Sequence, residues 1–140
     1  MSAAADEWEP VFTVNEYFDG PRQGFANYRG RPHAYLSEWD ERADDWRTIY
    51  LVSPVSDEQL RLAVEDWDIW RRWASAHHAG SLTPDDKHPA LAVDWPRHVE
   101  LQPLVKEAFA MDTSQASRAI PEFRGALEPI HDFEVCWHSA

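Results

Sequence analysis

Alternation of apolar and polar side chains predicts a β-strand near the start of the sequence, over residues 11–18. Phe12, Val14 and Phe18 fall on one face of this segment, with the period of two that a strand requires. Residues 19–21 read Asp-Gly-Pro, in which glycine tolerates a positive φ and proline fixes the next φ. We therefore expect a tight turn there and a return strand after it.

Further segments extend this sheet. Short apolar or alternating runs predict strands over residues 23–29, 33–39, 46–53 and 131–138. The first three of these follow one another with short connections and form a meander with antiparallel neighbours. Residues 119–127 are bounded by prolines, and their pattern favours neither a strand nor a helix. The pattern predicts an antiparallel sheet of about five strands, built from the meander and a C-terminal strand.

A tryptophan-rich helix follows the meander. Ser56 and Gln59 have the spacing of a capping box, which satisfies backbone N–H groups at the start of a helix. Asp68 and Arg72 have the i,i+4 spacing of an ion pair along a helix, and Gly80 is a typical helix terminator. An apolar stripe at helical spacing comprises Leu60, Ala63, Val64, Trp67, Trp70, Ala74 and His77. We expect this helix to lie across the sheet and to shield it from water.

A second helical segment covers residues 95–111 and contains Pro103. Proline lacks an N–H and clashes with the preceding turn, so Pro103 should kink or divide this helix. Residues 1–9 are small and acidic, which is typical of a flexible N-terminal tail. We therefore predict an α+β protein in which residues 10–140 form one domain, with the sheet packed against the tryptophan-rich helix and the second, kinked helix.

The charge of the chain limits its partners. Its 140 residues include 13 basic and 25 acidic side chains, a formal net charge of −12. This field repels phosphate backbones and anionic lipids, which argues against direct binding to nucleic acid or to a membrane surface. It favours a basic protein or a cationic ligand, although solubility alone also explains it. Because the sequence shows neither an apolar run of membrane-helix length nor a signal-peptide pattern, we expect a cytoplasmic protein.

The reactive side chains form no specific motif. Cys136 and His138 fall on one face of the last predicted strand and make only a weak catalytic pair. Eight tryptophans are many for this length, and they predict either a core of few large side chains or an aromatic binding surface. The possible metal ligands lack the spacing of a known site; they are His77, His78, Asp85, Asp86, His88 and His98. We therefore expect no catalytic residue, no metal and no cofactor.

One motif carries a resemblance to a known group of proteins. It consists of residues 17–26, which read Tyr-Phe-Asp-Gly-Pro-Arg-Gln-Gly-Phe-Ala, followed by Tyr28, Gly30, Pro32 and His33. The helix that follows contains residues 65–73, which read Glu-Asp-Trp-Asp-Ile-Trp-Arg-Arg-Trp. Together they resemble a pattern in small uncharacterised bacterial proteins, over the first two-thirds of the chain. The resemblance implies a bacterial origin and a shared fold, and it transfers no activity.

Residues 19–24 allow two interpretations. Two glycines permit a ligand to approach the backbone closely, and Arg22 is able to hold a carboxylate or phosphate by two parallel hydrogen bonds. The segment lacks the length and spacing of a P-loop or a dinucleotide fingerprint. A tight connection between two strands explains the same residues, and we favour it because glycine and proline are the usual turn residues.

Two functions of different classes fit these observations. The first is a small acidic binding or adaptor protein, of immunity or inhibitor type, that acts through contact with a basic protein partner. The second is a small-molecule-binding domain or minor enzyme with an aromatic pocket between sheet and helix. The sequence does not define the oligomeric state. The residues that we expect to contact a partner or ligand are Tyr17, Asp19, Arg22, Tyr28, His33, Tyr35, Trp67, Trp70 and Arg71.

Overall fold

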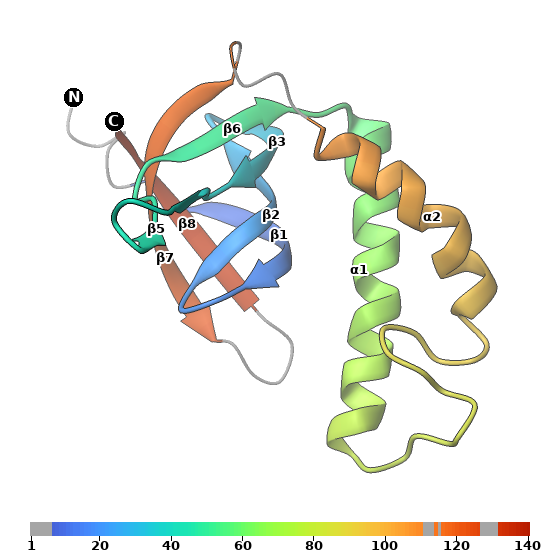
Figure 1. Ribbon diagram of the computed structural model, residues 1–140. Helices are drawn as coiled ribbons and strands as arrows, with labels where there is room; N and C mark the ends of the chain where they lie inside the picture. The colour runs from blue at the N-terminus through green and yellow to red at the C-terminus, as the bar shows by residue number, and fades with distance from the viewer. Residues whose placement is uncertain (1–6, 111–113, 115, 127–131) are drawn as a thin grey trace.

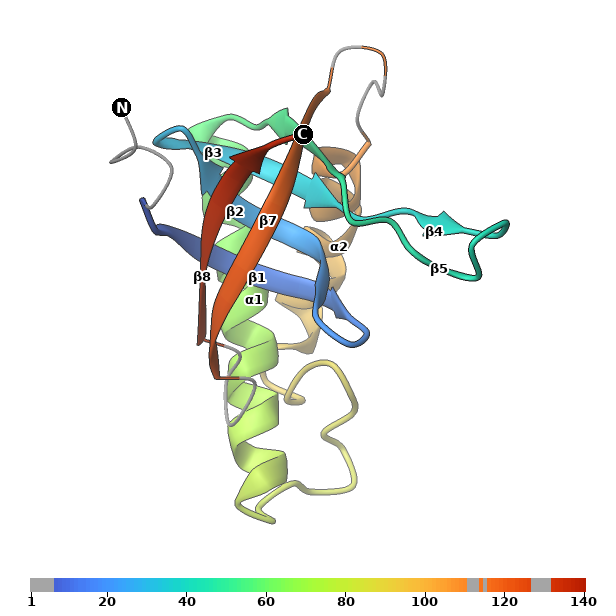
Figure 2. The ribbon, with the colours of Figure 1, turned by 90° about the vertical axis from the view of Figure 1, so that its left-hand side faces the viewer.

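The alternating segments pair side by side until the first strand meets the last, which closes the sheet into a barrel. The computed structural model describes residues 7–110, 114, 116–126 and 132–140. Within these residues, six antiparallel strands form the barrel (Figure 1), in the order β1 (Glu9–Tyr17), β2 (Pro21–Tyr28), β3 (Arg31–Leu36), β6 (Tyr50–Pro54), β7 (Ser117–Ala126) and β8 (Asp132–Ser139). Between β6 and β7 the chain forms α1 (Asp57–His78) and α2 (Trp95–Ala108). A hairpin of β4 (Trp39–Asp40) and β5 (Asp45–Trp46) follows β3 and projects from the barrel (Figure 2).

The predicted α+β class and the antiparallel sheet are confirmed, but the sheet closes on itself and, in the described part of the chain, has six strands instead of about five. The additional strand is β7, which covers most of residues 119–127. A proline is tolerated there because the pairing of β7 with β6 ends at Ala119, before Pro121. The strand predicted over residues 46–53 is divided, since Trp46 pairs with Trp39 in the hairpin and β6 begins at Tyr50.

The first two strands approach each other unusually closely. The predicted turn between them is confirmed, with φ values of 54° at Asp19 and 130° at Gly20. Further along β2, a Cβ atom built on Gly24 would lie 2.1 Å from the Thr13 carbonyl oxygen and 2.6 Å from the Tyr35 hydroxyl. Only glycine therefore fits at residue 24 without moving β1 or Tyr35.

Large aromatic side chains fill the barrel interior. Tyr35 is fully buried and donates a hydrogen bond of 3.0 Å to the Thr13 carbonyl oxygen. Burial raises the pKa of Tyr35 well above its usual value of 10.0. The Trp137 indole N–H donates to the Asn27 carbonyl oxygen at 2.8 Å. The interior cluster contains Ala26, Tyr28, Tyr35, Tyr50, Val52, Ala119 and Val135, with Val11, Phe123 and Trp137 packed against it.

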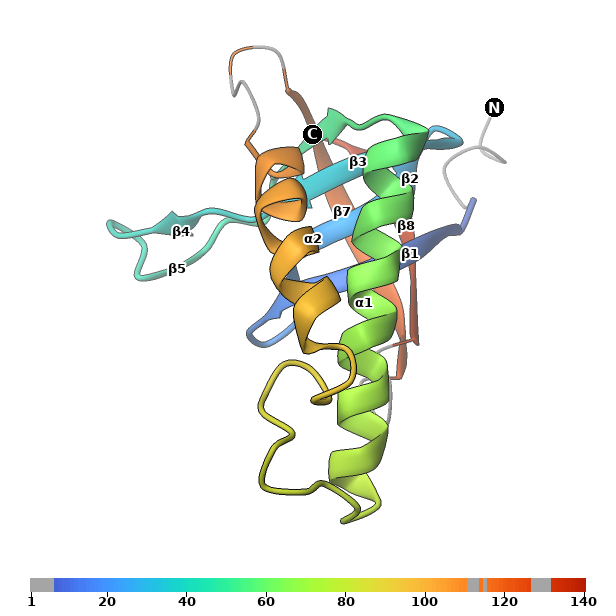
Figure 3. The same cartoon turned by 90° about the vertical axis from the view of Figure 1, so that its right-hand side faces the viewer.

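Both helices lie across the outer face of β1, β2 and β3 (Figure 3). The predicted capping box is confirmed: Ser56 Oγ accepts from the Gln59 N–H at 3.0 Å, and Gln59 Oε1 accepts from the Ser56 N–H at 2.9 Å. α2 continues through Pro103 without division and ends at Ala108, and residue 111 lies outside the described residues. The layer between barrel and helices contains Phe25, Ala34, Ala63, Val105 and Ala108, with Phe12, Val55, Leu60 and Phe109 packed against it.

α1 is long enough to pack against both the barrel and the segment that follows it. Its first half packs on the barrel, and its second half extends beyond the strands (Figure 1), where Ile69 packs against Ala90 and Leu101. None of the described helices is long and apolar enough to cross a membrane. Of the tail predicted over residues 1–9, residues 1–6 lie outside the described residues, and Glu9 already pairs with Val135 as the first residue of β1.

Candidate functional site

A cleft lies where β1 meets the two helices, and we term it the β1–helix cleft. Its volume is about 300 Å³, at the lower end of the ~300–1,000 Å³ that is typical of ligand pockets. It is lined by Val14, Asn15 and Tyr17 of β1, Asp66, Trp67 and Trp70 of α1, His88 and Pro89 of the loop between the helices, and His98 of α2. Four segments that are distant in the sequence therefore build one site.

A largely buried acid–histidine pair forms the polar side of this cleft. His98 Nδ1 lies 2.7 Å from Asp66 Oδ1, and the two side chains are only 9% and 16% exposed. Because an ionised carboxylate only accepts hydrogen bonds, Nδ1 is the donor in this contact, and in the neutral form of the imidazole Nε2 is then an acceptor. His98 Nε2 has no hydrogen-bond partner among the described residues, and it is not sealed from open space. The pair thus presents an acceptor to any molecule that enters the cleft.

Two stacked indole rings form the apolar side. Trp67 and Trp70 are three residues apart and lie on the same face of α1, with ring centroids 4.7 Å apart and ring planes 21° from parallel. Trp67 is buried, whereas Tyr17 is 40% exposed at the end of β1. A broad aromatic surface therefore lies beside the carboxylate of Asp66.

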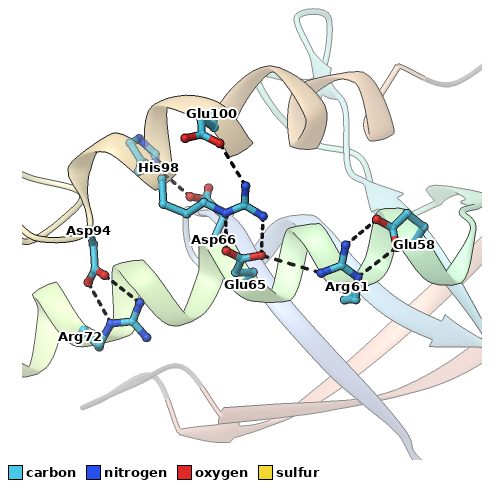
Figure 4. Close-up of polar contacts among 9 residues, drawn as sticks. Glu58, Arg61, Glu65, Asp66, Arg72, Asp94, His98 and Glu100 are labelled. Atoms are coloured by element: carbon cyan, nitrogen blue, oxygen red, sulfur yellow. Dashed lines mark hydrogen bonds and ion pairs between the residues drawn. The ribbon is translucent and has the colours of Figure 1, made fainter.

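Ion pairs between the helices hold α2 on α1 (Figure 4). Arg97 donates to both carboxylate oxygens of Glu65 at 2.5 and 2.9 Å, and Arg72 donates to both oxygens of Asp94 at 2.8 and 3.1 Å. The hydrogen bonds from Arg97 also lower the pKa of the Glu65 carboxyl group. Each ion pair is partly exposed, so screening by solvent keeps its contribution to stability small. Together they flank the acid–histidine pair and hold the two helices in the position that brings Asp66 and His98 together.

The loop between the helices supplies the remaining wall of the cleft. The Asp86 carboxylate accepts hydrogen bonds from the Ala92 N–H, the Thr83 N–H and the Thr83 hydroxyl at 2.8, 2.9 and 3.0 Å. The backbone N–H groups of Ala92 and Thr83 lower the pKa of Asp86. Further along the loop, the His88 ring meets Trp73 edge-on with a centroid distance of 4.6 Å. These contacts fix His88 in the cleft wall.

The reactive side chains that the sequence indicated have structural partners. His77 stacks on Trp73 at a centroid distance of 4.9 Å. Cys136 is buried, and His138 lies 3.1 Å from the Glu122 carboxylate on β7. Searched over the described part of the chain, the histidine, cysteine, aspartate and glutamate side chains form no group of three or more that could hold a metal ion.

The predicted contact residues lie in separate places. Tyr17, Trp67 and Trp70 line the β1–helix cleft. Tyr28 and Tyr35 belong to the barrel interior. His33 contacts the Tyr28 ring edge-on at 5.1 Å, also away from the cleft.

Asp19 and Arg22 lie at the β1–β2 turn. The Arg22 guanidinium donates to the carbonyl oxygens of Phe18 and Asp19 at 2.7 and 3.0 Å and to the Tyr50 hydroxyl at 3.1 Å. These bonds tie the turn to β6, which agrees with the interpretation of residues 19–24 as a tight connection. Arg22 is thus already bonded within its own turn.

The charged side chains on the outer face of α1 pair differently from prediction. The ion pair predicted between Asp68 and Arg72 is wrong, because Arg72 forms its two-pronged contact with Asp94. Arg71 instead lies 3.7 Å from Asp68. Two good hydrogen bonds to one carboxylate outweigh a single contact along the helix.

The sequence does not single out the acid–histidine pair. Asp66 stands among several charged residues of the helix, and His98 is only one of several histidines without metal-ligand spacing. The two residues are 32 positions apart. Their contact depends on how α2 folds back on α1, so no local signal marks it.

A second exposed feature, the hairpin surface, consists of Phe18, Trp39, Trp46 and the acidic residues of β4 and β5. Trp39 is 44% exposed and meets Trp46 edge-on at 5.4 Å, and Phe18 is 62% exposed and lies 6.2 Å from Trp46. Residues 38–47 add two arginines and the acidic side chains Glu38, Asp40, Glu41, Asp44 and Asp45. The hairpin, which projects from the barrel (Figure 2), therefore carries both aromatic and mostly acidic side chains.

A larger hollow of about 750 Å³ opens at one end of the barrel. Charged side chains of both signs line it, including Glu7, Glu9, Arg29 and Arg118. Glu9 accepts hydrogen bonds from the backbone N–H groups of Arg29 and Gly30 at 3.2 and 2.6 Å, so its carboxylate already closes the β2–β3 turn. Because both signs of charge occur there, this hollow indicates no ligand class.

Comparisons with other proteins assign this chain to no family. No model of a known protein family, no curated protein and no solved structure matches this chain. The resemblance to small bacterial proteins stays a prediction.

Proposed function

We propose that this protein binds a small organic molecule in the β1–helix cleft. The observation that carries the proposal is the hydrogen-bonded pair of Asp66 and His98, both of which line a cavity together with tryptophan rings. Ligand pockets usually combine an aromatic wall with a few polar groups that fix the orientation of the ligand. His98 Nε2 has no hydrogen-bond partner among the described residues, and a donor group of a ligand would supply one.

The geometry supports binding more directly than catalysis. An aspartate that orients an imidazole prepares it either for hydrogen bonding or for proton transfer. Nucleophilic catalysis also needs a hydroxyl or thiol at the imidazole. Among the described residues, no serine, threonine or cysteine side chain bonds to His98. We therefore base the proposal on recognition and assign no reaction to the pair.

Intrinsic tryptophan fluorescence tests this function. A panel of small metabolites is titrated into the protein, and a ligand in the cleft should change the emission saturably because Trp67 and Trp70 line it. Trp70→Phe should reduce the change, whereas Trp39→Phe, which alters an exposed indole on the hairpin, should leave it intact. A flat response to every compound, or a response that Trp70→Phe does not alter, would show that the cleft is not the binding site.

We propose contact with a basic protein as a second function, through the hairpin surface. Exposed aromatic side chains are enriched at the centres of protein interfaces, and the surrounding acidic side chains would attract a positively charged partner. The net charge of −12 acts in the same direction over longer distances. This proposal keeps the adaptor function expected from the sequence and assigns it to a defined surface.

Affinity capture from a cell extract tests the second function, with the wild-type chain compared with a Trp39→Ala variant. A basic protein should be retained by the wild type at low and at physiological salt, and Trp39→Ala should weaken its retention. Arg71→Ala, on the outer face of α1, serves as the control and should capture the same protein. If nothing is retained at either salt concentration, or if Trp39→Ala captures equally well, the hairpin surface has no such role.

A further inference from the structure

We infer that the molecule bound in the β1–helix cleft is an organic ammonium cation whose charge pairs with Asp66. This inference rests on the proposed small-molecule function and extends it by assigning the charge and the hydrogen-bonding pattern of the ligand. Three features of the cleft lead to it: its charge, the type of its open polar atoms, and its aromatic wall.

When its two histidines are neutral, the cleft carries a net negative charge. Its lining side chains include one carboxylate, that of Asp66, and no lysine or arginine. The arginines on the adjacent helix turns, Arg72 and Arg97, are already bonded to the carboxylates of Asp94 and Glu65. When the imidazole is neutral, no positive side chain offsets the Asp66 carboxylate in this largely buried place. An anion in the cleft would therefore be repelled by Asp66, whereas a cation would pair with it.

The open polar atoms of the acid–histidine pair are acceptors. Asp66 uses Oδ1 to bind His98, and its Oδ2 makes no hydrogen bond to any described residue. His98 Nε2 is the second acceptor, because the proton of the neutral ring lies on Nδ1. An alkylammonium group has N–H donors and no acceptor, so it matches both atoms. A carboxylate or phosphate offers acceptors only, and it matches neither.

The aromatic wall favours the same ligand class. Trp67, Trp70 and Tyr17 line the cleft beside Asp66. A cation near the face of an indole or phenol ring gains electrostatic attraction from the π electrons, and this gain increases when water is excluded. Trp67 is only 8% exposed and the Asp66 side chain only 16%, so the ion pair would form in a largely dehydrated place. The net charge of −12 also raises the local concentration of cations around the protein.

Matched compounds test the inference on the wild-type protein. Several small scaffolds are titrated, each as the amine, the alcohol and the carboxylate; benzylamine, benzyl alcohol and benzoate form one such set. Tryptophan emission and calorimetry should show the amine binding about tenfold more tightly than the alcohol, with the carboxylate weakest. Equal or tighter binding of the alcohols or carboxylates overturns the charge assignment and leaves the proposed function standing. If no compound of any charge binds, the proposed function itself fails, and the inference fails with it.

Two matched variants then locate the charge. Asp66→Asn removes the buried carboxylate and keeps an oxygen for His98, and it should weaken amine binding by roughly 30-fold or more. Asp68→Asn changes the net charge of the same helix equally, but at an exposed position that contacts Arg71, and it should leave amine affinity almost unchanged. Equal losses in both variants would mean that only the overall field matters and would overturn the pairing with Asp66. If Asp66→Asn does not fold, as judged by circular dichroism, the ranking of the matched compounds on the wild type decides alone.

A lysine side chain of another protein carries the same ammonium chemistry as a free amine. Nα-acetyl-lysine methylamide, in which the backbone amine and carboxylate are blocked, distinguishes these sources. Binding as tight as that of the best free amine supports the pairing with Asp66 and indicates a lysine-bearing partner. Binding of the free amines alone supports the pairing and indicates a metabolite.

Discussion

Replacing Gly24 by alanine should strongly destabilise this protein. The backbone of Gly24 does not lie in the left-handed region, so alanine meets no conformational penalty there. The cost is steric, because the new methyl group would lie 2.1 Å from the Thr13 carbonyl oxygen and 2.6 Å from the Tyr35 hydroxyl. The first of these atoms belongs to the backbone, so β1 itself has to move.

The magnitude follows from three contributions. Overpacking of a tight core costs about 1–3 kcal/mol. Displacement of Tyr35 breaks its 3.0 Å hydrogen bond to Thr13, and leaving these buried groups unpaired adds about 1–3 kcal/mol. The smaller entropy of an unfolded chain with alanine offsets about 0.4–1 kcal/mol. We expect a net loss of about 3 kcal/mol in the free energy of unfolding, or about 10 °C in Tm for a chain of this size.

Urea denaturation followed by circular dichroism measures this loss, and Gly30→Ala is the matched control. Gly30 has a φ of 77°, and nothing lies within 4 Å of a Cβ built on it. Its substitution therefore reports the cost of left-handed backbone alone, about 1–2 kcal/mol. The steric reasoning is refuted if Gly24→Ala costs less than Gly30→Ala, or if its Tm stays within 2 °C or so of the wild type.

Three further predictions concern pH and helix capping. Burial raises the pKa of Tyr35 above its unfolded value of 10.0, so the stability that this group contributes is complete below pH 10 and is lost as pH rises further. Between about pH 8 and about pH 11, the Tm of Tyr35→Phe should therefore fall less steeply with pH than the Tm of the wild type. Hydrogen bonds from Arg97 lower the pKa of Glu65 below its usual 4.5, so this contribution is present above pH 4.5 and is lost as pH falls; Glu65→Gln should flatten the acid limb of the Tm profile, and an unchanged limb would contradict the assignment. Ser56→Ala removes a helix cap and should lower the free energy of unfolding by about 1 kcal/mol in urea titrations, whereas a neutral result would mean that the cap is not formed in solution.

The sequence predicts those elements whose signals are local. The capping box of Ser56 and Gln59 lies within four residues, and the apolar stripe of α1 continues for several turns, so the start and the course of this helix are predictable. The turn at residues 19–21 is predictable for the same reason, because glycine and proline determine its backbone directly.

Closure of the barrel has no comparable signal. A strand that pairs with one neighbour and a strand that pairs with two show the same alternation, so the open sheet predicted from the pattern and the closed barrel are indistinguishable at that level. The division of residues 46–53 also depends on tertiary contacts, since Trp46 turns outward to join Trp39 while Tyr50 turns inward.

The candidate site shows the same limit. Trp67 and Trp70 are predictable as a pair on one helix face, and both reach the cleft. Asp66 and His98 become a pair only when α2 folds back on α1. The aromatic half of the cleft is therefore visible in the sequence, whereas its polar half requires the three-dimensional arrangement.

The contact between β1 and β8 has a consequence for the order of folding. Among the described residues this seam consists of the pairs of Glu9 with Val135 and of Pro10 with Glu134, which join positions more than a hundred residues apart. Contacts over such separations form slowly, because the entropy cost of closing a large loop comes before the pairing that offsets it. We expect the meander and α1 to acquire structure first and this seam to form last. Amide hydrogen exchange should accordingly be faster at the seam than in the centre of β2.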